Sequence, residues 1–287
     1  MSTAKQLLLM GLPETGKTTL VAALWHLVES KEVERSLSLQ RLEGDRTALN
    51  QLRDLWMNAK APERTEQDTA QPVVLQLVPT AGGAPFSLHI PDMAGETYRS
   101  QWVHRQWTQE HAERVEKADG ILLAIHTKIR KPTLLCEIQS AFSGEPPQPP
   151  AGKKTGKPTP ARAWEPEHAS TQVMLVDLLQ FALAARTGRE PLRVAVLFTA
   201  WDLVPSPVPK PEDWLDQELP LLAQYLHSNA GLLAIRCYGV SAQGGDYTKA
   251  AERQALADQL LHSERIQITG PDCTPHDLTA PIFWLLA

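Results

Sequence analysis

Apolar residues along this chain gather into short uninterrupted runs, and these alternate with longer segments of helical spacing. The run GILLAIH, residues 120–126, is typical of a strand that is buried on both faces. In RTALNQLRDLWMNAK, residues 46–60, the apolar side chains recur every three or four positions, which predicts a helix. Similar runs predict strands at residues 6–10, 73–78, 86–90, 193–198 and 232–238, and an alternating segment predicts a surface strand from about residue 37.

Helical spacing follows most of these strands, so the chain alternates between strands and helices. The expected helices cover residues 17–29, 171–186, 213–227 and 250–262, with a further long helix that ends near residue 117. This alternation predicts an α/β fold with three layers, α/β/α, around a mostly parallel sheet with one antiparallel edge strand. Ligands of such sheets bind at the carboxyl ends of the strands.

One segment interrupts the pattern. Residues 143–167, SGEPPQPPAGKKTGKPTPARAWEPE, are rich in proline, glycine and lysine and offer little apolar surface to bury. Such a composition predicts a disordered insertion, at about residues 143–168. The remainder of residues 1–287 is interpreted as a single domain, with an extra strand and helix at about residues 37–60.

The first strand leads into GLPETGKT, residues 11–18, and then directly into a helix. Glycines let successive backbone N–H groups turn toward phosphate oxygens, and the helix adds its positive end. Lys17 is expected to reach the β- and γ-phosphates of a nucleotide, and the Thr18 hydroxyl to bind Mg²⁺. The predicted phosphate-binding residues are Gly11, Pro13, Glu14, Thr15, Gly16, Lys17, Thr18 and Thr19.

DMAGE, residues 92–96, follows the strand at residues 86–90. An aspartate here, Asp92, is predicted to hold Mg²⁺, and Gly95 to offer its N–H to the γ-phosphate. The alternative is a strand-to-helix turn in which Asp92 serves only as a helix cap.

TAWD, residues 199–202, and VSA, residues 240–242, follow two later strands. Asp202 is placed to accept both N–H groups on the Watson–Crick edge of guanine, which adenine cannot match, and the Ala242 N–H to donate to guanine O6. Each motif alone fits a helix cap or a turn serine equally well. Together, in this order, they predict that Thr199, Asp202, Ser241 and Ala242 bind a guanine nucleotide.

The series GLPETGKT, DMAGE, TAWD and VSA resembles the guanine-nucleotide boxes of the TRAFAC class of GTPases, which includes Ras-like and Era-like proteins. Its layout is similar to that of bacterial TRAFAC-clade GTPase-like proteins. The resemblance implies a P-loop NTPase fold and a GTP–Mg²⁺ or GDP ligand. It also implies hydrolysis by a molecular switch, and a protein effector or regulator that senses the switch.

The chain departs from the usual boxes at three positions. Ala200 replaces the lysine that packs on the base, and Glu96 replaces a water-orienting glutamine, so Glu96 and Lys17 are the expected catalytic residues. Glu14 stands where Era-like proteins often carry an asparagine that helps to hold a monovalent cation. The resemblance also implies a switch threonine that binds Mg²⁺, either Thr69, which is closer to the next strand, or Thr65.

Composition narrows the setting. A net charge of −5 and a pI near 6.0 argue against a nucleic-acid partner. Three widely spaced cysteines, no secretory signal and no apolar stretch long enough to span a bilayer favour a cytoplasmic protein. Three histidines show no metal-ligand spacing and are interpreted as surface or packed residues: His104, His111 and His126. Two rival functions remain open: a nucleotide-binding interaction module with little turnover, and an ATPase or small-molecule kinase.

Overall fold

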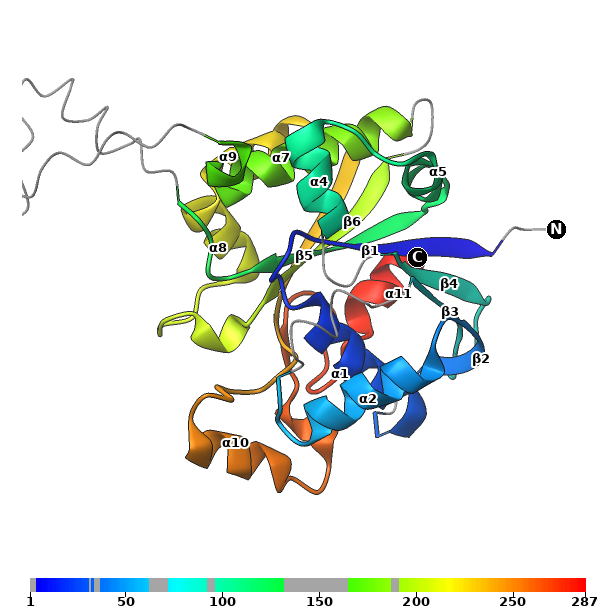
Figure 1. Ribbon diagram of the computed structural model, residues 1–287, viewed down its shortest axis with the longest axis vertical. Helices are drawn as coiled ribbons and strands as arrows, with labels where there is room; N and C mark the ends of the chain where they lie inside the picture. The colour runs from blue at the N-terminus through cyan, green and yellow to red at the C-terminus, as the bar shows by residue number, and fades with distance from the viewer. Residues whose placement is uncertain are drawn as a thin grey trace, which may run out of the picture.

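The computed structural model describes residues 4–30, 32–33, 37–61, 72–91, 96–131, 165–186 and 191–287. Within these residues, eight strands form one sheet in the order β2-β3-β4-β1-β5-β6-β7-β8 (Figure 1). The strands are β1 Lys5–Met10, β2 Leu37–Glu43, β3 Val73–Pro79, β4 Phe86–Ile90, β5 Gly120–His126, β6 Leu192–Thr199, β7 Leu233–Ser241 and β8 Gln267–Thr269.

The sheet is mostly parallel, as predicted. The neighbours β4, β1, β5, β6 and β7 all pair in parallel. An antiparallel edge strand is present as β8, which pairs with β7. A second antiparallel strand is β3, which pairs with β4. It is not an edge strand, because β2 pairs with its other side and forms that edge of the sheet. The carboxyl ends of the five parallel strands therefore meet along one edge of the sheet.

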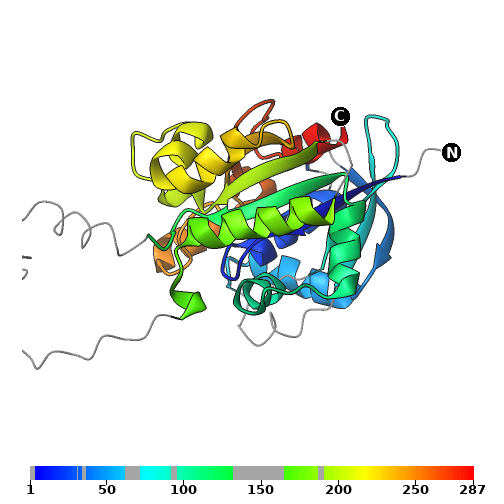
Figure 2. The same ribbon diagram turned by 90° about the horizontal axis from the view of Figure 1, so that it is seen from above.

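Helices cover both faces of this sheet, which confirms the three-layer α/β/α fold (Figures 1 and 2). One face carries α4 Glu96–His104, α5 Gln109–Lys117, α7 Thr171–Ala185, α8 Pro211–Glu218 and α9 Pro220–Ser228. The other face carries α1 Lys17–Ser30, α2 Arg46–Met57 and α11 Ala280–Leu286. Beyond it lies α10 Ala250–Ala257. The described part of the chain also contains the short 3₁₀ helices η1 Pro166–His168, η2 Trp201–Leu203 and η3 His262–Arg265.

Two hydrophobic cores lie on the opposite faces of the sheet. Strand β1 supplies both, because successive side chains of a strand point to opposite faces. Leu7 and Leu9 join the core beneath α1, α2 and α11, whereas Leu8 and Met10 join the core beneath α7 and α9. An uninterrupted apolar run is therefore what this central position in the sheet requires. No helix in the described part of the chain is long and apolar enough to span a membrane.

Two of the expected helices are each split into two. The long helix that ends at Lys117 is interrupted after His104, where Arg105 adopts a positive φ of 59°, and Thr108 then caps α5 by accepting the His111 N–H. The helix expected over residues 213–227 breaks before Pro220, which has no N–H to donate to the preceding turn. Strand β8 and helix α11 near the carboxyl end were not predicted as elements.

The extra strand and helix at about residues 37–60 are present as β2 and α2. Strand β2 extends the sheet beyond β3, and α2 packs along α1. Asp45 caps α2 by accepting the Thr47 N–H at 2.7 Å, and Trp25 of α1 donates its indole N–H to Asn50 at 3.0 Å. Of the proline-rich insertion expected at residues 143–168, residues 143–164 lie outside the described residues.

Acidification is expected to destabilise this fold, with His26 as a main cause. His26 lies between α2, η3 and Glu32, and its Nε2 is 2.9 Å from the Glu32 carboxylate. Burial lowers its pKa below 6.5, with His262 and Arg265 contributing, although Glu32 opposes the shift. Because the unfolded chain then binds the proton first, stability is fully present above pH 6.5 and is lost as the pH falls toward the pKa of the folded state.

Melting temperatures measured without nucleotide from pH 7.5 to 5.5 would check this expectation. Burial also lowers the pKa of His89, His126 and His262, so all four groups act in the same direction. His26→Asn should flatten the dependence in part, and a melting temperature that stays constant or rises on acidification would contradict the sign.

Candidate nucleotide-binding site

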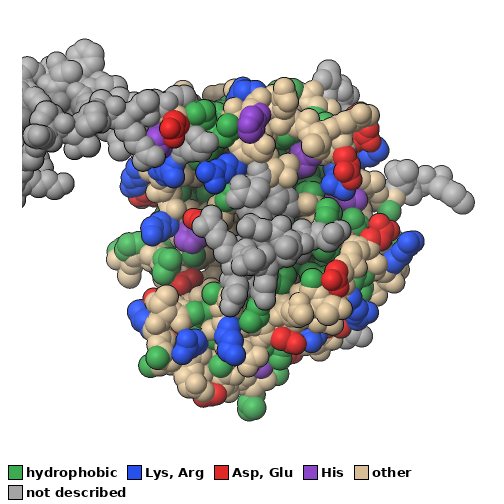
Figure 3. All heavy atoms as spheres, viewed as in Figure 1, with side chains coloured by type: hydrophobic (Ala, Val, Ile, Leu, Met, Phe, Trp, Pro, Cys, Tyr) green, Lys and Arg blue, Asp and Glu red, His purple; other side chains and the backbone are tan. Residues whose placement is uncertain are grey.

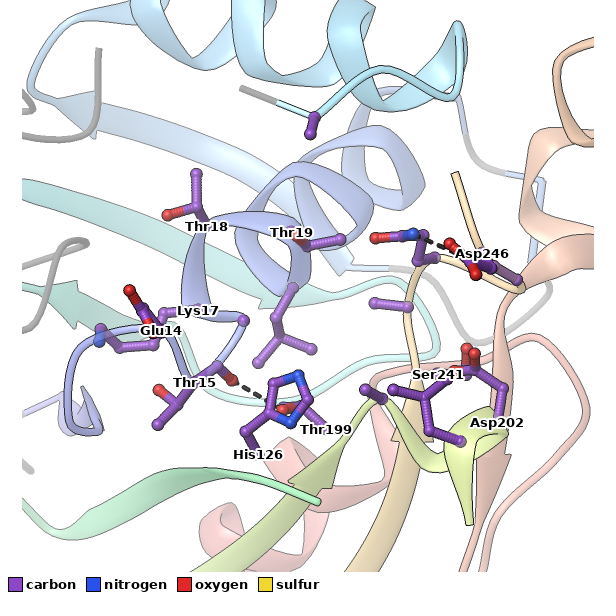
Figure 4. A pocket seen from close by; sticks show the side chains of 18 residues that line it. Glu14, Thr15, Lys17, Thr18, Thr19, His126, Thr199, Asp202, Ser241 and Asp246 are labelled. Carbon is purple, nitrogen blue, oxygen red and sulfur yellow. Dashed lines mark hydrogen bonds between the residues drawn. The ribbon is translucent and has the colours of Figure 1, made fainter. Parts of the chain in front are cut away.

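A cavity of about 390 Å³ opens at the carboxyl ends of β1, β5, β6 and β7. The predicted phosphate-binding and base-binding segments form its two sides (Figure 4). Lys17, Glu14 and Thr18 lie on one side of this view, and Asp202, Ser241 and Asp246 lie on the other. The lining residues are Glu14, Thr15, Gly16, Lys17, Thr18, Thr19, Leu20, Ala61, His126, Thr199, Ala200, Asp202, Leu203, Ser241, Ala242, Gln243, Gly245 and Asp246.

Lys17 is the charged centre of the first side. Its side chain is only 2% exposed, and its Nζ donates to the carbonyl oxygens of Gly11 and Leu12, each at 2.8 Å. A buried ammonium group is costly unless it is paired with acceptors or with an anion. A lysine held in this way beside a cavity creates the positive potential that a phosphate ligand requires.

The loop before Lys17 is shaped by its own backbone. Glu14 and Gly16 have positive φ angles of 60° and 76°, and α1 then begins at Lys17. The amino-terminal end of α1 therefore faces the cavity and adds the favourable end of its dipole for an anion. Of the predicted loop residues, Gly11 and Pro13 do not line the cavity, although Gly11 contributes the carbonyl that accepts from Lys17.

Thr199 ties the two sides together. Its hydroxyl, which lies at the end of β6, donates to the Thr15 carbonyl at 2.7 Å (Figure 4). Both side chains are buried, at 6% and 5% exposure. This hydrogen bond fixes the distance between the phosphate loop and the TAWD segment, so the first residue of that segment supports the loop from behind.

The second side is built on Trp201. This side chain is 7% exposed and packs between Phe198 and Trp214, with ring centroids 6.0 Å from each. Its ring also lies against the backbone of Gly239, where an added Cβ would stand 2.4 Å from ring atoms. Because Trp201 is anchored inward, the adjacent Asp202 is left exposed at the cavity.

Gly239→Ala is expected to destabilise the protein by at least about 2 kcal/mol, because the added methyl group overlaps the Trp201 ring. The same substitution should weaken ligand binding, since Trp201 supports Asp202. Gly231→Ala is the matched control, because a Cβ there meets nothing within 4 Å. Urea unfolding of both variants checks the prediction, and equal stabilities would contradict it.

The VSA segment forms a tight turn at the end of β7. The Ser241 hydroxyl is buried and accepts the Gly244 N–H at 3.0 Å, which closes the turn. The Ala242 carbonyl accepts the indole N–H of Trp56 at 2.8 Å. These two bonds hold Ser241 and Ala242 at the cavity.

His126 lines the cavity as well, although the sequence analysis interpreted it as a surface or packed residue. It ends β5, and its Nδ1 accepts the Lys128 N–H at 2.8 Å, so the neutral ring carries its proton on Nε2. Burial lowers its pKa, as does Lys128, while Asp202 and Glu14 oppose the shift. Its place at the carboxyl end of a central parallel strand is the signal in the sequence that could have assigned it to the site.

Several predicted site residues cannot be placed. Thr65, Thr69, Asp92 and Gly95 lie outside the described residues. Helix α4 begins at Glu96, but the side chain of Glu96 lies outside them too. Their roles stay predictions. Among the residues that the structure describes, there is no group of three or more histidine, cysteine, aspartate or glutamate side chains that would hold a metal ion.

The molecular face of Figure 3 carries acidic and basic side chains in an interspersed pattern. No continuous basic surface is seen on that face among the described side chains.

Three solved structures show a distant likeness to this chain. The signal recognition particle receptor SRb-GTP/SRX complex from Chaetomium thermophilum is 12% identical, with 91% of this chain and 100% of that chain covered and a TM-score of 0.44. A bacterial selenocysteine-specific elongation factor EF-Sec is 13% identical, with 88% and 28% covered and a TM-score of 0.37. Sup35 complexed with GDP is 12% identical, with 86% and 39% covered and a TM-score of 0.33.

The family comparison is of another kind, because it spans nearly the whole sequence. The model of the Double-GTPase 1 family matches residues 8–285, which include both sides of the cavity. A search of curated proteins finds no match. The predicted likeness to P-loop GTPases is thereby confirmed: the chain belongs to the Double-GTPase 1 family and is a GTP-binding protein.

Proposed function

We propose that this protein binds GTP with Mg²⁺ in the cavity, hydrolyses it to GDP and phosphate, and acts as a molecular switch. One observation supports this most directly. A buried lysine at a helix start and an exposed carboxylate on a separate strand end line the same cavity, with Thr199 linking their two segments. The lysine is suited to bind phosphates, and the carboxylate is suited to accept hydrogen bonds from the donor edge of guanine.

At the phosphate side, the roles follow from charge. Lys17 neutralises the β- and γ-phosphates, and the N–H groups of the loop at Glu14, Thr15 and Gly16 surround their oxygens. Because Lys17 is held in place before the nucleotide arrives, little reorganisation is needed when charge develops in the transition state.

Mg²⁺ fits this side as part of a nucleotide complex. The ion binds through few protein oxygens and keeps several ligands from phosphates and water. The Thr18 side chain lines the cavity beside Lys17, and with Asp92 and a switch threonine, Thr69 or Thr65, it would hold the ion. The bound ion would neutralise phosphate charge.

At the base side, Asp202 would accept the N1–H and the N2 amino group of guanine, and the Ala242 N–H would donate to O6. Ala200 leaves the base without the lysine stem that usually packs on it. Leu203 also lines this side and offers apolar contact.

Hydrolysis would be assisted by Glu96, which orients the attacking water, or by a residue of a partner. Loss of the γ-phosphate would then change the segments at residues 61–70 and 93–100, which a protein effector or regulator would sense. We also propose that the protein is a bacterial, cytoplasmic member of the TRAFAC class. Residues 1–287 would form a single GTPase-like domain.

A nucleotide-binding module with little turnover is the second candidate. Glu96, which stands in place of the water-orienting glutamine, and Ala200, in place of the usual lysine, both motivate it. Single-turnover hydrolysis at saturating protein separates the two. A rate equal to that of GTP in buffer would favour the module.

Competition binding of GTP, GDP and ATP, with Mg²⁺ and a fluorescent guanine nucleotide, tests the proposed site. Guanine nucleotides should displace the probe, and ATP should require a concentration at least about 100-fold higher, because adenine leaves the Asp202 carboxylate without donors. Equal displacement by ATP would remove the base-recognition role of the TAWD segment.

A further inference from the structure

Trp56 joins the inserted helix α2 to the turn after β7, residues 241–244, which is the base-recognition loop of the proposed function. Its indole is 2% exposed, and Nε1–H donates to the Ala242 carbonyl at 2.8 Å. The two residues are 186 positions apart in the chain. A purely apolar residue would have filled the same space, so the N–H group calls for an explanation.

Two further side chains, Arg265 and His26, contact the Trp56 ring. The Arg265 guanidinium lies over the ring with its Cζ 3.7 Å from the centroid, and its Nη2 donates to the Trp56 carbonyl. His26 contacts the ring from α1, with centroids 5.1 Å apart. The ring is thus fixed from two sides, and its N–H has little freedom to leave Ala242.

The carboxyl end of α2 also reaches the cavity. The backbone N–H groups of Ala59 and Lys60 donate to the carbonyls of Trp56 and Leu55, respectively. These bonds turn the chain at the end of α2, and the next residue, Ala61, lines the cavity. One helix therefore holds the base loop through Trp56 and forms part of the cavity rim through Ala61.

We propose that Trp56 is a positioning residue for purine recognition, which fixes the Ala242 loop so that the Ala242 N–H faces O6 of the base. The inference rests on the proposed function and adds α2 as a structural part of base selection. Without the indole N–H, the Ala242 carbonyl would be left buried without this donor, and the loop would turn to find another.

The test compares Trp56→Phe with Trp25→Phe. Each removes one indole N–H bond made by α1 or α2, but the Trp25 bond goes to Asn50, away from the base loop. The ligands are GDP, 6-thio-GDP, which replaces the O6 acceptor by sulfur, and IDP, which lacks the N2 amino group. Relative affinities are obtained by displacement of a fluorescent guanine nucleotide.

Trp56→Phe should reduce the preference for GDP over 6-thio-GDP by about five-fold or more, the effect of one lost hydrogen bond to a buried group. The preference for GDP over IDP, which depends on Asp202, should stay as in the wild type. Trp25→Phe should leave both preferences unchanged, even where it lowers the melting temperature equally.

Three outcomes overturn the inference. The first is that Trp56→Phe discriminates between the ligands as Trp25→Phe does. The second is that the wild type does not distinguish GDP from 6-thio-GDP. The third is that, in Trp56→Phe, the preference for GDP over IDP changes as much as the preference for GDP over 6-thio-GDP. A wild type that binds no guanine nucleotide overturns the proposed function as well. Should Trp56→Phe not fold, 3-benzothienylalanine at position 56 removes only the N–H, keeps the two-ring shape, and must give the same result.

Discussion

Replacing Lys17 with alanine is expected to weaken GTP binding by at least about 100-fold and to abolish measurable hydrolysis. Removal of a buried charged donor that serves two phosphates costs about 3 kcal/mol or more, and each 1.4 kcal/mol is a factor of ten in affinity. The side chain is nearly fully buried at the cavity, so water cannot substitute for it easily. Titration with a fluorescent GTP analogue checks the affinity, and phosphate release checks the hydrolysis.

The loss of Lys17 also has a structural component that the experiment must separate. Its Nζ joins the Gly11 and Leu12 carbonyls, so the alanine variant loosens the loop even without ligand. Lys117→Ala, at a site where the lysine is 61% exposed, controls for the loss of a charge. The melting temperature without nucleotide measures how much stability the loop loses in the variant. A Lys17→Ala protein that binds GTP within a few-fold of the wild type would contradict the phosphate role.

The phosphate loop was readable from the sequence because its determinants are local. The run from residue 6 to 10, the glycines and Lys17 lie within one strand–loop–helix unit, and their order dictates the geometry. The sequence also predicts that Asp202 and Ala242 lie near this loop, and both line the cavity. The reason is related, because each follows a parallel strand and the carboxyl ends of such strands converge. The parallel sheet topology therefore brings these two residues, which are distant in sequence from the phosphate loop, to the same cavity.

The parts that sequence reasoning missed depend on contacts between distant elements. No local pattern indicates that Trp56 bonds to Ala242, or that the Trp201 ring needs a glycine at Gly239. The break at Arg105 arises from one backbone angle, whereas its surroundings keep helical spacing. Strand β8 has only three residues, too few to show an alternating pattern. Packing and backbone geometry determine such features, and they leave no periodic pattern of apolar residues in the sequence.

Asp202→Asn is expected to reverse the base preference of the cavity. In the proposed complex, the wild-type carboxylate accepts from both N1–H and the N2 amino group of guanine. An asparagine amide accepts only one of these and turns its own NH₂ toward the other donor. We expect GDP affinity to fall by at least about 100-fold, because two charge-assisted hydrogen bonds are lost and one repulsion is gained.

Xanthine nucleotides show why the loss should be selective. Xanthine carries a carbonyl oxygen in place of the N2 amino group, so the asparagine NH₂ meets an acceptor there. The affinity for XDP should therefore rise in the variant while that for GDP falls, which general unfolding cannot produce. Competition of GDP, XDP and ATP against one fluorescent nucleotide measures all three.

Asp246→Asn is the matched control within the same cavity. Its carboxylate already accepts the Thr248 N–H at 2.9 Å and the Thr248 hydroxyl at 2.6 Å, so it is engaged within its own turn. We expect its guanine preference to match the wild type, because an amide oxygen can still accept both bonds. If Asp246→Asn gains xanthine binding and Asp202→Asn does not, the base is read by the turn after β7, and the TAWD segment serves only to anchor Trp201.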